Sequence, residues 1–266
     1  MSHRFWSVAA VATLLAASLA AAEIKVSLEK ETVGRPPQIF EPIVGTWVVA
    51  KDGSDKVVMV DGRPWVASKD NPTKLLVESA RKLYGTSNEE LMDNAKQFAY
   101  YPVAVLKTVQ NFSNGSIAVK FKTISGDADR CSGILFNVKE NGDWLALRYN
   151  DTEHNVILWE FHNGIRRPLI RPRDGDLLKA PGDREKWHEL RLDVDGGTIT
   201  GTLDGAKVLS YVLGSAPPPG RNNTPPSADL LPENNPVLRA PVNGKVGLWS
   251  KTDSTSYFKD YVVNAK

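Results

Sequence analysis

Hydrogen-bonding side chains are concentrated in the segment 148–155, which joins two hydrophobic runs of β character. Arg148, Asn150, Glu153 and Asn155 lie within these eight residues. Guanidinium, amide and carboxylate groups together supply the donors and acceptors that neighbouring sugar hydroxyls require. Asn and Asp also stabilise turns by bonding to their own backbone. Two interpretations therefore stay open: a ligand site, and a turn tied together by a buried ion pair.

Three residues outside this segment are predicted to complete the site. Trp159, on the following run, offers an aromatic face for stacking on a sugar ring, and core packing is its alternative role. Lys251 and Asp253 lie in the polar turn between the last two β-type runs. They would meet the first group if the chain closes into a sandwich.

No strong catalytic motif is found in the sequence. It lacks a G-x-S-x-G nucleophile elbow, an H-E-x-x-H helix and a Walker loop. It also lacks the E-x-D-x-x-E strand motif that places two carboxyl groups about 5 Å apart for retaining glycoside hydrolysis. The catalytic residues are therefore unknown, and an enzyme of this sequence would be a glycoside hydrolase using Glu153, Asp151 or His154 as acid or base.

The sequence contains one cysteine, Cys131, so it forms no intramolecular disulfide. Its place on a β-type run next to glycine indicates a buried small hydrophobe rather than a nucleophile. A calcium ion is the one cofactor for which ligands are suggested. Asp260 and Asp129, with backbone carbonyl groups, are the candidate oxygen donors.

Composition and the N-terminus indicate an exported globular protein. The chain has 266 residues, 41% hydrophobic and 24% charged, which suits one large β domain. Residues 1–22 read as a signal peptide, with Arg4, an apolar run and small residues at 20 and 22, too short for a membrane span. Without Arg4 the net charge falls from +2 to +1, which favours neither nucleic acid nor an anionic membrane as a partner. We expect a periplasmic or secreted protein.

Short β-type runs separated by Gly- and Asn-containing turns dominate the mature chain, 23–266, which we predict to be a single domain. The predicted strands are 46–49, 56–60, 115–124, 133–138, 144–149, 156–161, 187–194, 198–203 and 207–212, with two more in 244–263. Residues 71–98 interrupt them with a predicted helical insertion. The proline-rich stretch 214–241 is predicted to be a long loop, which either borders a site or is simply mobile.

Four segments resemble a known family in type and order. They are SGDADRCSGILF, LRYNDTEHNVILWEFHNGIRRPL, KWHELRLDVDGGTITGTLDG and GKVGLWSKTDSTSYFKDYVV. They resemble secreted bacterial laminin-G-like, concanavalin A-like jelly-roll domains, close to the 3-keto-disaccharide hydrolase (DUF1080) group, over 103–263. The family pattern R-x-N-x-x-E-x-N matches residues 148–155, and its closing segment matches Lys251, Asp253 and Asp260.

The resemblance implies an all-β, concanavalin A-like jelly-roll β-sandwich and association with carbohydrate or another glycan. It transfers hydrolase activity less safely, because fold does not fix chemistry. We therefore predict an exported glycan-binding protein. A hydrolase of the keto-disaccharide type and a structural or protein-binding module of the cell envelope are the alternatives.

Overall fold

The computed structural model describes residues 22–64, 101–162, 165–170, 182–216, 219, 225, 228, 231 and 233–266. The predicted helical insertion lies outside these residues. So does the predicted signal peptide except for Ala22, and so does part of the proline-rich stretch. No helix in the described ranges is long and apolar enough to cross a membrane.

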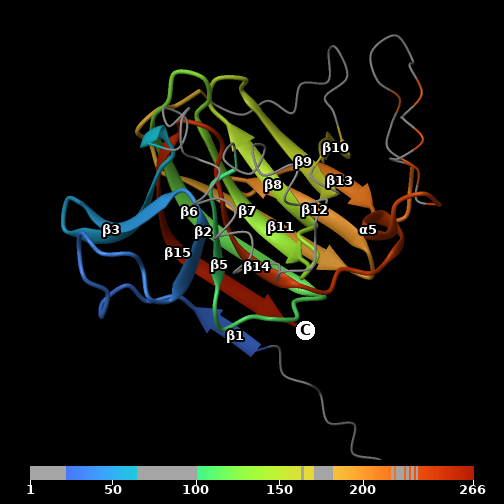
Figure 1. The fold of residues 1–266 in the computed structure, drawn as a ribbon, viewed down its shortest axis with the longest axis horizontal. Helices are drawn as coiled ribbons and strands as arrows, with labels where there is room; N and C mark the ends of the chain where they lie inside the picture. The colour runs from blue at the N-terminus through green and yellow to red at the C-terminus, as the bar shows by residue number, and fades with distance from the viewer. Residues whose placement is uncertain are drawn as a thin grey trace, which may run out of the picture.

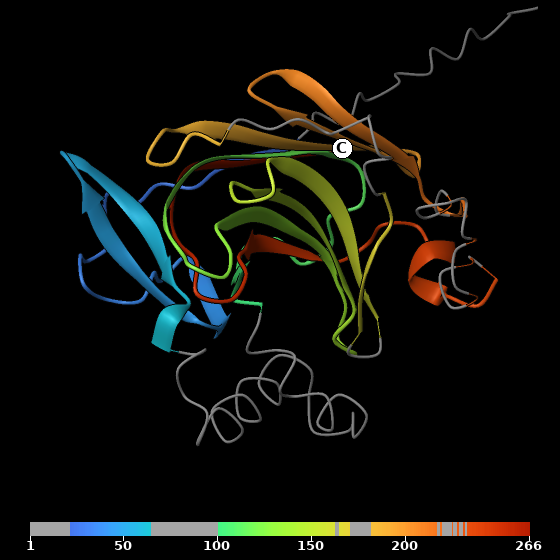
Figure 2. The same cartoon turned by 90° about the horizontal axis from the view of Figure 1, so that it is seen from above.

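Two antiparallel sheets make up the described part of the chain, and they lie one above the other (Figures 1 and 2). The larger sheet has the order β13 (Ala206–Val212), β12 (Thr198–Leu203), β11 (His188–Asp195), β6 (Gly115–Ser125), β15 (Thr255–Ala265), β4 (Asp55–Asp61) and β3 (Thr46–Asp52). Strand β1 (Ala22–Lys25) also pairs with β15.

The smaller sheet has the order β10 (Ile165–Pro168), β9 (Asn155–His162), β8 (Trp144–Asn150), β7 (Cys131–Val138), β14 (Lys245–Trp249), β5 (Val103–Leu106) and β2 (Phe40–Val44). A short helix, α5 (Pro236–Arg239), lies within the proline-rich stretch 214–241, near its end, and is capped by Asn235. Figure 2 shows α5 at one end of the sandwich and the β3–β4 hairpin at the other.

Two hydrophobic clusters flank the smaller sheet. Leu145, Leu147 and Tyr149 of β8 pack into the core between the sheets, whereas Trp144 and Ala146 belong to a second cluster. Successive residues of a strand point to opposite faces, so the second cluster lies on the outer face of the smaller sheet. All seven residues of β8 are buried, because the second cluster covers the outer face of the strand as the core covers its inner face.

The jelly-roll prediction is confirmed, and all of the predicted strands are found. Their turns use the expected residues: Asp204 (φ 50°) and Gly205 (φ 78°) close the β12–β13 hairpin in the left-handed region. Four strands were not predicted. They are β1, β2, β5 and β10, each only four or five residues long; β2, β5 and β10 also lack a clear alternation of polar and apolar residues.

Candidate functional site

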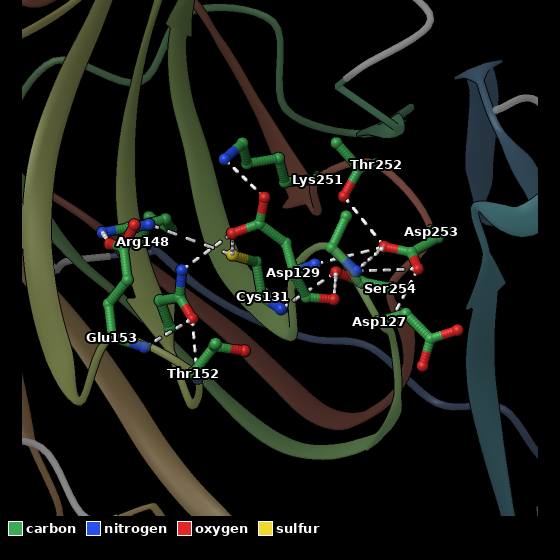
Figure 3. A network of polar contacts seen from close by, with 12 residues as sticks. Asp127, Asp129, Cys131, Arg148, Thr152, Glu153, Lys251, Thr252, Asp253 and Ser254 are labelled. Atoms are coloured by element: carbon green, nitrogen blue, oxygen red, sulfur yellow. Dashed lines mark hydrogen bonds and ion pairs between the residues drawn. The ribbon is translucent and has the colours of Figure 1, made fainter.

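A polar network lies on the outer face of the smaller sheet, where β7 begins and the β8–β9 turn meets the turn after β14 (Figure 3). Its members on the sheet come from neighbouring strands in antiparallel register: Cys131 is opposite Asn150, and Asn150 is opposite Asn155. We call the residues Asp129, Arg148, Asn150, Glu153, Asn155, Trp159, Arg166 and Lys251 the polar cluster.

Arg148 is the centre of the polar cluster and is 1% exposed. Its Nη2 lies 2.8 Å from Glu153 Oε2 and 2.6 Å from Asn155 Oδ1. Gly133 faces it on β7, and a Cβ at that position would lie 3.2 Å from the ring of Trp249. The glycine therefore lets β7 pass close to Trp249, and the buried guanidinium of Arg148 is held in one place by a charged and a neutral acceptor.

Asn150 connects this centre to the closing turn. Its Nδ2 donates to Asp129 Oδ1 at 2.9 Å, and its Oδ1 accepts from the backbone of Thr152 and Glu153. Asp129 in turn pairs with Lys251 Nζ at 2.5 Å. The turn interpretation of Asn150 is therefore correct, and the same side chain also links Lys251 to the cluster.

Asp253 has a supporting role beside the cluster. Its carboxylate accepts hydrogen bonds from the backbone of Asp127, Ala128 and Asp129, at 2.6 to 3.2 Å. Burial opposes its ionisation, but these bonds outweigh that effect and lower the pKa of Asp253. Asp253 was predicted to contact ligand. In the structure its carboxylate binds the backbone of the loop that carries Asp129.

Trp159 carries stacked guanidinium groups. The Arg166 guanidinium carbon lies 3.9 Å from the centre of the Trp159 ring and 5.0 Å from that of Tyr101, while that of Arg148 lies 5.5 Å from Trp159. Trp159 is partly exposed, unlike Trp144, which is 2% exposed and stacked on Phe161. Trp159 therefore belongs to the cluster, and Trp144 belongs to the core.

Glu153 is the exposed carboxylate of the polar cluster. Its side chain is 49% exposed, and although burial opposes ionisation, Arg148 lowers its pKa below the ordinary value. Of the other acid–base candidates, Asp151 is 2% exposed and paired with Arg130 at 2.6 Å. His154 lies in the turn with φ 52°, its ring against Gly182. Only Glu153 of the three contacts Arg148.

Cys131 is fully buried, as predicted. Burial raises the pKa of its thiol to about 12, so the sulfur stays protonated at neutral pH. Its Sγ lies 3.7 Å from Asp129 Oδ1 and 4.0 Å from Arg148 Nη1. The thiol fills space beneath the cluster and is not a nucleophile.

The predicted calcium site is wrong in its pairing of Asp129 with Asp260. The backbone of Asp129 bonds to Ser254, and Asp260 stands six residues farther along β15, roughly 15 to 20 Å away at strand spacing. Each carboxylate has a lysine partner instead, Lys251 and Lys120 respectively. No group of three or more acidic, His or Cys side chains suited to a metal occurs within the described ranges.

Two features of this region were not predicted. One is Arg166, which lies opposite Phe161 in register and whose side chain packs on Trp159. Glu160 points the other way, into the core, and is 0% exposed. Alternation along β9 separates the two faces, so it could have placed Trp159 and Glu160 on opposite sides.

No protein-family model and no curated protein matches this chain. Among solved structures it is similar to the carbohydrate-binding module CBM66 from Bacillus subtilis, with 14% identity, TM-score 0.50 and coverage of 85% of this chain and 96% of that one. It is also similar to the Crh5 transglycosylase (15%, TM-score 0.47, 93% and 86%). A third similar structure is a galectin-like protein from Bacillus subtilis (12%, TM-score 0.42, 85% and 88%). At this identity the first similarity shows the jelly-roll fold and does not by itself assign a ligand to this chain.

Proposed function

We propose that this protein is exported and binds a carbohydrate at the polar cluster. The observation that carries the proposal is the buried Arg148, held by Glu153 and Asn155 beside the partly exposed ring of Trp159. Fixed donors and acceptors next to an aromatic face are what binding of a sugar ring requires. The similarity in fold to a carbohydrate-binding module adds support.

A role as a purely structural turn is the competing explanation. It accounts well for Asn150 and Asp253, whose bonds are mostly to backbone groups. It accounts less well for Glu153, whose side chain stays half exposed, and for the exposure of Trp159. A structural ion pair gains most when both partners are enclosed, and here one partner is left open to solvent.

Hydrolysis of a glycoside is a second candidate function, in line with the resemblance to the 3-keto-disaccharide hydrolase group. The observation that favours it is Glu153, an exposed carboxylate that Arg148 keeps ionised and so able to accept a proton, although its lowered pKa makes it a weak base. Such a mechanism also needs a proton donor near the leaving group, which Asp151 cannot supply while it is buried against Arg130. Binding is therefore proposed first.

A glycan array probed with the mature protein tests the proposal, with product analysis on every glycan that binds. Glu153→Gln keeps the shape of the side chain and removes its charge, and we expect binding to weaken by about tenfold or more. Glu140→Gln, in the exposed turn after β7, is the matched control and should bind as wild type does. Binding that Glu153→Gln leaves unchanged, or no binding to any glycan, would contradict a carbohydrate site here. Cleaved products would add the hydrolase function.

Export is tested separately by fractionation and N-terminal sequencing of the natural protein. We expect a mature chain that begins near residue 23. Recovery of Met1 in the exported protein would contradict the proposed signal peptide.

A further inference from the structure

The charges of the polar cluster do not balance. Arg148 is paired with Glu153, and Lys251 is paired with Asp129. Arg166 is the third cation, and none of the carboxylates that the structure describes forms an ion pair with it. Its contacts with described residues are to the rings of Trp159 and Tyr101. The cluster therefore contains one uncompensated guanidinium.

This guanidinium is partly withdrawn from water. Arg166 is partly exposed, and its Nη1 is buried and has no hydrogen-bond partner among the described residues. Burial lowers the pKa of Arg166, and the nearby charge of Arg148 acts in the same direction. Arginine nevertheless stays protonated in proteins, so the cost of the unpaired charge remains until an anion arrives.

Two further buried N–H donors lie near Arg166. Trp159 Nε1 and Arg148 Nε are also buried, and neither has an acceptor in the part of the chain that the structure describes. They belong to the side chains that stack with Arg166 or lie beside it. Three unpaired N–H groups and one unpaired positive charge call for a ligand group that only accepts hydrogen bonds.

The stacking also restricts the geometry of such a group. With its plane against Trp159, a guanidinium keeps its N–H edge for in-plane hydrogen bonds. A carboxylate matches that edge with two parallel bonds, whereas a sulfate or phosphate is tetrahedral and not restricted to one plane. A sugar whose carboxylate binds Arg166 in this way would place its own ring beside Trp159.

We infer that the bound glycan is acidic and that Arg166 receives the carboxylate of a uronate residue. The inference rests on the proposed carbohydrate function and names the class of sugar. Arg148 and Lys251 are already neutralised by the protein, so the carboxylate is assigned to Arg166 and not to them.

The test measures binding of tetragalacturonate, of oligomers of glucuronate and mannuronate, and of the methyl ester of each, by titration calorimetry. Esterification removes the charge and leaves the sugar ring unchanged. We expect at least one acid to bind about tenfold to a hundredfold more tightly than its ester, the range of a charge-assisted bidentate contact. Arg166→Met should remove this preference while leaving the binding of the ester.

Two further variants separate charge from structure. Arg166→Lys keeps the charge without the planar edge and should retain only part of the preference. Arg191→Met, on the opposite sheet where Arg191 pairs with Asp193, is the matched control and should behave as wild type. The melting temperature of ligand-free Arg166→Met should not fall, because no described partner is left unpaired.

Each outcome bears on one proposal or the other. Equal affinity for acid and ester, a preference that persists in Arg166→Met, or selective binding of sulfated sugars alone would overturn the uronate inference. In all three cases a glycan still binds, so the proposed function stands. Failure to bind any acid, ester or neutral glycan would instead contradict the proposed function itself.

Discussion

Glu160 tests how much an ionised carboxylate destabilises the interior of this sandwich. The side chain is 0% exposed and lies opposite Arg167 of β10 in register. Asn235, the cap of α5, donates to Glu160 Oε1 at 2.9 Å, while no described residue forms a hydrogen bond with Oε2. Burial raises the pKa of Glu160 to about 7, even though Asn235, Arg167 and His162 favour the charged form.

The expected effect on stability follows from that pKa. An unfolded glutamate titrates near 4.5, so the two states differ by about 2.5 in pKa, or about 3 kcal/mol. Between pH 4.5 and 7 the folded protein holds the proton more tightly than the unfolded chain. The contribution of Glu160 to the free energy of unfolding is therefore most favourable below pH 4.5. It falls as the pH rises to 7, and above pH 7 the free energy of unfolding is lower by about 3 kcal/mol.

Urea denaturation of wild type and Glu160→Gln at pH 5 and pH 8.5 measures this effect. Glutamine can still accept from Asn235 and cannot ionise. We expect the two proteins to agree within about 1 kcal/mol at pH 5, and the variant to be more stable by about 2 to 3 kcal/mol at pH 8.5. Glu189→Gln, exposed on β11, is the control and should change stability by less than about 0.5 kcal/mol at both values.

His162 titrates in the same pH range and has to be separated from Glu160. Its Nδ1 lies 2.9 Å from Asp143, which raises the pKa of His162, so its contribution is present at low pH and is also lost as the pH rises. The comparison is therefore repeated in a His162→Gln background. A Glu160→Gln variant whose difference from wild type does not change with pH would refute the reasoning.

Three further predictions concern the other side of the smaller sheet. Arg148→Met should abolish glycan binding. It should change the free energy of unfolding by less than about 1.5 kcal/mol, because methionine fills the space of the arginine and the half-exposed Glu153 becomes hydrated. A large loss of stability in a urea titration would instead indicate that Arg148 and Glu153 form a structural ion pair. Asp253→Ala removes the acceptor of three backbone N–H groups, so it should lower the free energy of unfolding by about 1 to 2 kcal/mol and speed amide exchange at 127–129. Slow exchange at these residues would contradict the role of Asp253 in holding this loop. The melting temperature should be the same in excess calcium and in excess chelator. A rise of several degrees with calcium would show a calcium site that Asp129 and Asp260 do not provide.

Local sequence patterns predicted the long strands and the convergence of Arg148, Glu153 and Asn155, because these depend on alternation and on one hairpin. The short strands escaped prediction for a local reason. In β5, four consecutive residues are buried, so no polar position marks the alternation. In β2, Pro42 argues against a strand, yet β2 is at the edge of its sheet, where proline is tolerated.

The remaining errors concern contacts between segments far apart in the chain. The pairing of Asp129 with Lys251 spans the β6–β7 loop and the turn after β14, and sequence proximity favoured neither Lys251 nor Asp260 as its partner. The burial of β8 on both faces depends on aromatic residues from several strands, such as Tyr101, Phe161 and Trp249. A pattern within one strand cannot show what covers its second face.

The position of β15 in the larger sheet has a consequence for how the chain folds. It pairs with β6 along one edge, while along the other Thr255–Phe258 pair with β4 and Val262–Ala265 pair with β1. All three partners precede it in the chain, so β6 and β4 have no shared neighbour until β15 has been synthesised. This interior strand of the sheet is thus added after its neighbours, through contacts of large sequence separation that form slowly. The larger sheet therefore cannot be completed until residues 255–265 have been synthesised.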